Sequence, residues 1–146
     1  MTKITSQKIL EKVRNLDEYL NYLNSLKEEA KSEENFVGDF HLFGLTERYL
    51  QLAIQVIVDI LNLVIIEEGL EKPDESQEII SLLFNYGVIS ENLASRLAGI
   101  VGFRNILVHE YGKIDRKRIY QYLTHHLGDL SDFKKEILKW LKKSVK

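Results

Sequence analysis

The stretch that decides the fold is residues 49–66, YLQLAIQVIVDILNLVII, the most apolar run in the chain. Its polar residues Gln51, Gln55, Asp59 and Asn62 recur at spacings of four, four and three, which places them on one stripe of a helix. A helix that faces lipid would not carry such a stripe. We therefore predict a core helix of a soluble bundle, with no membrane as a partner.

Helical periodicity continues on both sides of this run. Apolar residues at three- and four-residue steps predict a long amphipathic helix over residues 6–31, capped by Thr5 or Ser6, and the polar residues 31–39 form a connection. The central helix is expected over about residues 41–68. The remaining boundaries follow from capping and helix-ending residues. Gly69 and Pro73 end the central helix, and a short third helix over residues 76–86 ends at Gly87. Ser90 caps a fourth helix from 91 to about 108, Asp115 caps a fifth, and an amphipathic tail ending in Trp140 and Leu141 follows.

Composition supports a helical architecture. The chain of 146 residues has one proline and eight glycines and shows no alternating strand pattern. Long helices joined by short connections are typical of an up-and-down bundle. We predict an all-α fold with an up-and-down bundle of four or five helices, and a single domain covering residues 1–146.

Several classes of site are excluded by the sequence. The absence of cysteine removes disulfides, thiolate zinc sites and a cysteine nucleophile. No Glu is followed by His three residues later, as a di-iron bundle requires, and no Walker or Rossmann glycine pattern is present. The neighbours His125 and His126 point in two directions on a helix and cannot chelate as an i, i+4 pair would. We expect no metal and no cofactor.

Charge is distributed unevenly along the chain. Residues 1–112 contain 10 Lys/Arg and 18 Asp/Glu, hence −8, whereas residues 113–146 contain 10 Lys/Arg and 4 Asp/Glu, hence +6. The basic part is either a face for phosphates or a solvated helical face. The first ten residues, MTKITSQKIL, lack the apolar stretch of a signal peptide, so the expected location is cytoplasmic.

The strongest candidate for a catalytic segment is residues 99–112, GIVGFRNILVHEYG. On a helix, Asn105 and His109 are i, i+4 neighbours, and Arg104 and Tyr111 are seven residues apart. Arginine grips phosphate oxygens bidentately, and histidine exchanges protons near neutral pH. Together they suit RNA cleavage through the ribose 2′-hydroxyl. A buried Arg–His–Tyr hydrogen-bond cluster that closes the bundle explains the same residues, and both interpretations stay open at this point.

A longer match favours the catalytic interpretation. The spacing of Arg104, His109 and Tyr111 is R-x4-H-x-Y, residues 47–54 read ERYLQLAI, and residues 102–111 read GFRNILVHEY. These segments, with Gly69 and Pro73, resemble the HepT-like toxins of the HEPN superfamily over roughly residues 40–140.

This resemblance implies a HEPN-like homodimer in which two copies of the motif face a shared cleft. It implies a type II toxin that is a metal-independent endoribonuclease, with Arg104 and His109 as catalytic residues and Asn105 in a supporting role. The implied partner is a minimal nucleotidyltransferase antitoxin that transfers AMP onto Tyr111. The alternative is a non-catalytic, substrate-binding subunit of a nucleotidyltransferase complex.

Overall fold

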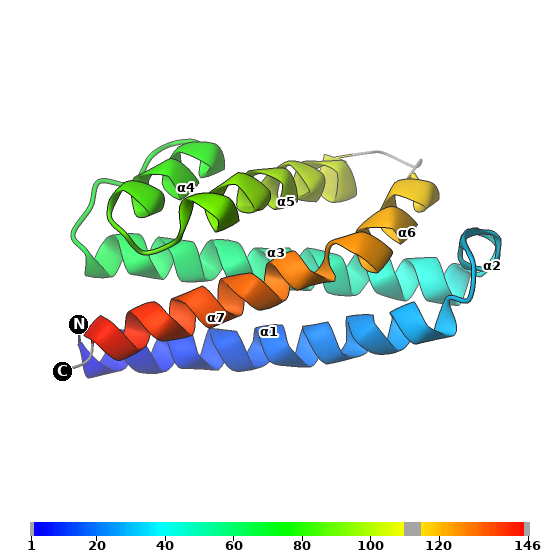
Figure 1. The fold of residues 1–146 in the computed structure, drawn as a ribbon, viewed down its shortest axis with the longest axis horizontal. Helices are drawn as coiled ribbons and strands as arrows, with labels where there is room; N and C mark the ends of the chain where they lie inside the picture. Colours follow the sequence, from blue (N-terminus) through cyan, green and yellow to red (C-terminus); the bar gives the residue numbers. More distant parts are fainter. Residues whose placement is uncertain (1, 110–114, 145–146) are drawn as a thin grey trace.

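The computed structural model describes residues 2–109 and 115–144, without the side chains of residues 76, 105, 106, 108 and 109. Most of this part of the chain is helical. The two longest helices run side by side, and α7 and α5 lie along them (Figure 1). In chain order the helices are α1 (Lys3–Glu29), α2 (Glu33–Val37), α3 (Phe40–Glu67), α4 (Ser76–Asn85), α5 (Glu91–His109), α6 (Arg116–His125) and α7 (Leu127–Ser144).

The core forms around the pair α1 and α3. On α1 the buried side chains follow three- and four-residue steps and face α3; they are Ile9, Val13, Leu16, Leu20, Leu23 and Leu26. Full burial of such an aliphatic side chain contributes about 1.5–3 kcal/mol, so this row supplies much of the stability of the pair. The predicted all-α bundle is confirmed.

The central helix α3 contacts α1, α2, α4, α5 and α6, which explains why its sequence is apolar on most sides. By length and composition alone α3 could cross a membrane, but 56% of its most apolar window is buried inside the bundle. Part of its polar stripe also points toward neighbouring helices. Gln51 hydrogen-bonds α5, and Asp59 pairs with Lys12 of α1.

Most predicted helix ends are confirmed. Ser90 accepts a hydrogen bond from the Leu93 N–H at 3.1 Å, and Asp115 caps α6. Gly69 and Gly87 have φ of 67° and 75°, a left-handed conformation that glycine adopts at low cost. Both end their helices in the paired backbone hydrogen bonds of a Schellman motif.

The start of the first helix was predicted wrongly. Thr2, not Thr5 or Ser6, is the cap, because its Oγ1 accepts from the Thr5 N–H at 3.1 Å and the helix begins at Lys3. A polar first turn without apolar periodicity gave no sign of this extension.

The predicted connection over residues 31–39 contains the short helix α2. Ser32 caps it by accepting from the Asn35 N–H at 3.0 Å. Its Phe36 is fully buried and contacts the Tyr120 ring at 5.3 Å between centroids. One buried aromatic side chain thus orders a segment whose other residues are mostly polar.

Candidate active site

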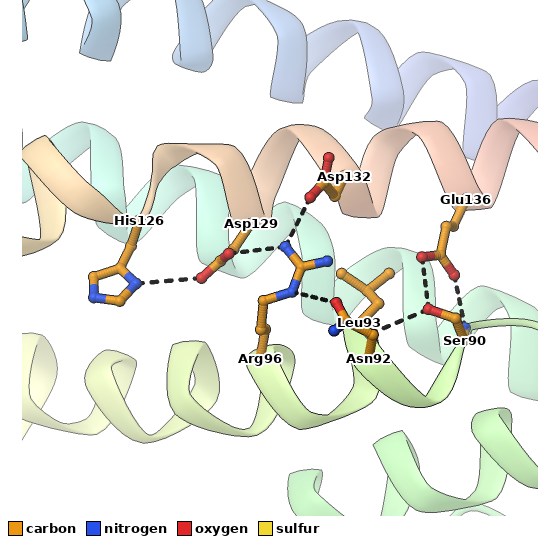
Figure 2. A network of polar contacts seen from close by, with 8 residues as sticks. All are labelled: Ser90, Asn92, Leu93, Arg96, His126, Asp129, Asp132 and Glu136. Atoms are coloured by element: carbon orange, nitrogen blue, oxygen red, sulfur yellow. Dashed lines mark hydrogen bonds and ion pairs between the residues drawn. The ribbon is translucent and has the colours of Figure 1, made fainter.

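Helix α5 carries two arginines, eight residues apart, in different electrostatic surroundings. Arg96 lies in the first half of the helix and pairs through Nη1 with Asp129 Oδ1 at 2.9 Å and Asp132 Oδ2 at 2.7 Å, both on α7 (Figure 2). The hydrogen bond to Asp129, followed by that to Asp132, raises the pKa of the Arg96 guanidinium above its usual value. Two carboxylates therefore satisfy the charge of Arg96, and its role is to join α5 to α7.

Further contacts from the start of α5 to α7, and at the start of α7, lie on both sides of Arg96. The Ser90 N–H and hydroxyl donate to the two carboxylate oxygens of Glu136 at 2.7 and 2.8 Å, and His126 Nδ1 lies 3.3 Å from Asp129 Oδ2 (Figure 2). Ser90 is also the helix cap. These contacts fix the beginning of α5 against α7 and leave the other end of the helix to be held by α3.

Arg104 lies near that other end and has a neutral partner. Its Nη2 donates to Oε1 of Gln55 at 2.7 Å, and among the described residues Arg104 makes no ion pair with a carboxylate. The Arg104 side chain is partly exposed. A permanent cation that is held by a neutral group keeps its charge available for an anion such as phosphate.

Helix α3 holds the end of α5 through two glutamines one turn apart. Gln51 donates through Nε2 to the Leu107 carbonyl at 3.2 Å, one of the last carbonyls of a helix, which lack an intrahelical partner. Gln55 binds Arg104 and donates through Nε2 to Asp59 Oδ1 at 2.8 Å. Asp59 Oδ2 lies 3.2 Å from Lys12 Nζ on α1.

The structure places one of the four predicted site residues with its side chain. Asn105 and His109 lie in the last turns of α5, but their side chains lie outside the described part of the chain, as does Tyr111. The predicted approach of Asn105 to His109 therefore stays a prediction. Sequence reasoning missed Gln55 as a site residue, although its four-residue spacing from Gln51 and Asp59 was the available signal.

His125, His126 and Lys134 make contacts within or between helices. His125 contacts its own helix, with Nδ1 3.1 Å from the Gln121 carbonyl oxygen, and His126 belongs to the Arg96 network. No group of three His, Asp or Glu residues among those described could hold a metal ion. On α7, Lys134 pairs with Asp17 of α1, so part of the basic tail serves to join helices.

Comparison with known proteins assigns the chain to a family. The model of the ribonuclease HepT-like family matches residues 9–137. The chain belongs to the ribonuclease HepT-like family. The match spans α1 to α7, which includes the first helix, for which the sequence offered only periodicity. The predicted family and its toxin-type ribonuclease class are confirmed.

Two curated nucleases and one solved complex illustrate the relationship. An mRNA nuclease HepT from Shewanella oneidensis is 31% identical over 98 residues, which is 67% of this chain and 74% of that protein. A tRNA nuclease HepT from Aphanizomenon flos-aquae is 28% identical over 141 residues, 97% of this chain and 95% of that one. The tri-AMPylated HEPN toxin of Shewanella oneidensis, solved in complex with its MNT antitoxin, superposes with a TM-score of 0.81 at 25% identity, covering 95% of this chain and 99% of that one.

Proposed function

We propose that this HepT-like protein is the toxin of a toxin–antitoxin pair and cleaves RNA in the cytoplasm without a metal ion. The observation that carries the proposal is the hydrogen bond of Arg104 to the neutral amide of Gln55, which holds this cation near the last turns of α5. His109 lies five residues further along the same helix. The cationic group for phosphate and the residue for proton transfer therefore belong to one helix.

In the proposed reaction, the ribose 2′-hydroxyl attacks the adjacent phosphorus and the bond to the 5′-oxygen breaks. His109 takes the proton from the 2′-hydroxyl or gives one to the departing 5′-oxygen, a contribution of about 10²–10⁴-fold. Arg104 stabilises the negative charge that grows on the phosphorane oxygens. Asn105 supports the imidazole orientation. The products are a 2′,3′-cyclic phosphate and a 5′-hydroxyl.

The proposed partner is a minimal nucleotidyltransferase antitoxin that attaches AMP to Tyr111. The AMPylated state of the Shewanella oneidensis toxin in its complex with an antitoxin supports this assignment. The presence of Arg104, His109 and Tyr111 in one motif favours the catalytic function over the alternative of a non-catalytic subunit. The two curated nucleases act on different RNA classes, so both mRNA and tRNA belong in the substrate trial.

The proposal is tested by incubating the purified protein with mRNA and tRNA in EDTA. We expect fragments that end in a 2′,3′-cyclic phosphate and begin with a 5′-hydroxyl, because the 2′-hydroxyl is the nucleophile. Mass spectrometry of the fragments identifies both ends. Cleavage that requires added Mg²⁺, or fragments with 5′-phosphates, would contradict the mechanism.

We further propose that the protein works as a two-fold homodimer. One motif supplies one histidine, so a second copy would bring a second acid–base group to a shared cleft, through isologous contacts. Exposed apolar side chains near the start of α3 support a dimer contact at the end of the bundle where α3 begins. Phe40 is 68% exposed and Leu45 is 46% exposed. The apolar character of α3 as a whole gives no such support, because its contacts within the protomer account for it.

The dimer is tested by sedimentation or light scattering at micromolar concentration. The expected mass is twice the 17.0 kDa of the chain. Replacing Phe40 and Leu45 by serine is expected to shift the equilibrium toward the monomer and to lower cleavage in parallel. A wild-type protein that stays at 17.0 kDa while cutting RNA would eliminate the shared-cleft arrangement.

A further inference from the structure

The polar stripe of α3 has a role beyond keeping the helix in a soluble bundle. Gln55 and Asp59 are one helical turn apart and form a continuous chain of contacts with residues of two other helices. The chain runs from Arg104 on α5 to Gln55 at 2.7 Å, from Gln55 to Asp59 at 2.8 Å, and from Asp59 to Lys12 on α1 at 3.2 Å. Its members are all partly buried.

We propose that Gln55 is the positioning residue of Arg104, and that Asp59 with Lys12 fixes the orientation of the Gln55 amide. The inference rests on the proposed function, since it assigns to Gln55 the task of aiming the guanidinium that binds the scissile phosphate. Gln55 itself touches Arg104 and not the RNA.

Hydrogen-bond chemistry explains why a glutamine occupies this position. A guanidinium can only donate and an ionised carboxylate can only accept. The Gln55 amide meets both demands, because its Oε1 faces Arg104 and its Nε2 faces Asp59. The donor on one side and the acceptor on the other permit only one orientation of the amide. Lys12 balances the charge of Asp59 on its far side.

The neutral charge of Gln55 matters as much as its geometry. Arg96, on the same helix, shows the opposite arrangement, in which two aspartates take up the guanidinium charge. A carboxylate at position 55 would hold Arg104 equally close but would compete with the RNA phosphate for it. An amide orients the guanidinium and leaves its charge for the substrate.

Two isosteric substitutions separate orientation from charge. Gln55→Met keeps the side-chain length without either hydrogen bond, and we expect kcat to fall about 10- to 100-fold with little change in KM, since a misplaced catalytic group costs up to about this much. Gln55→Glu adds a carboxylate beside Arg104 and is expected to raise KM as well. Asp59→Asn, on a side chain that is 32% exposed, is expected to lower kcat less than Gln55→Met.

The matched control is Gln77→Met. Gln77 also donates from a neighbouring helix to α5, through Nε2 to the Ala98 carbonyl at 3.1 Å, but it has no contact with Arg104. We expect wild-type kcat and KM for this variant. Thermal unfolding of all variants separates loss of activity from loss of fold, and Asp59→Asn provides the test if Gln55→Met does not fold.

A double variant decides whether Gln55 acts through Arg104. If it does, Gln55→Met should cause no further loss in an Arg104→Ala background, because interacting residues are non-additive. Wild-type kcat in both Gln55→Met and Asp59→Asn, with cleavage by Arg104→Ala strongly reduced, would overturn the role of Gln55 and leave the proposed function intact. Full activity of Arg104→Ala would instead remove the proposed function.

Discussion

Arg104→Ala is expected to lower RNA cleavage by about 10²–10³-fold or more, the usual cost of removing one group that stabilises transition-state charge. The protein should keep its helical circular dichroism, because Arg104 is partly exposed and its described hydrogen bond joins it to one neutral side chain. Initial rates on a defined RNA, with circular dichroism of the same samples, measure both quantities.

Arg96→Ala is the control for Arg104→Ala, because both residues are arginines on α5. Losing the contacts to Asp129 and Asp132 should cost about 1–2 kcal/mol of stability, with cleavage at 25 °C unchanged. If Arg104→Ala unfolded the protein and Arg96→Ala abolished cleavage, the assignment of the two arginines would be reversed. Unfolding by Arg104→Ala alone would favour the buried-cluster interpretation of the motif.

Modification of Tyr111 is expected to abolish cleavage altogether. Tyr111 follows His109 by two residues, so an attached AMP would bring a bulky group and negative charge to the end of the helix that carries Arg104. Repulsion of the RNA phosphate and occlusion of the site act together, as when phosphorylation disrupts an anion-binding site. Co-expression with the proposed nucleotidyltransferase partner should yield protein heavier by about 329 Da for each AMP.

Tandem mass spectrometry locates the modification. We expect it on Tyr111, and Tyr111→Phe should escape both the mass increase and the loss of activity. Tyr120 and Tyr122 are the nearest other tyrosines in sequence, and Tyr122 is only 6% exposed. AMP on Tyr120, or full cleavage by the AMPylated protein, would disprove this mode of control.

Helix positions followed from the sequence because they depend on local features. Apolar spacing defined α1 and α3, and the glycines at 69 and 87 marked the ends of α3 and α4, where the left-handed conformation is needed. The short helix α2 escaped prediction because its order depends on the contact of Phe36 with Tyr120, 84 positions away in the chain.

The candidate site was predictable only in part, for the same reason. Arg104 and His109 stood out as a motif within one helix. The partner of Arg104 is Gln55, 49 residues earlier in the chain, and its two hydrogen bonds depend on how α3, α5 and α1 pack. Likewise, the sequence did not show that two aspartates of α7 neutralise Arg96, whereas the partner of Arg104 is neutral.

Metal-free acid–base catalysis by His109 is tested most directly by the initial rate of RNA cleavage in EDTA, measured for the wild type and for His109→Ala. The predicted result is cyclic-phosphate fragments from the wild type and a rate lower by about 10²–10⁴-fold in the variant, the usual contribution of proton transfer. Equal rates for the two proteins, or no wild-type cleavage until Mg²⁺ is added, would contradict it.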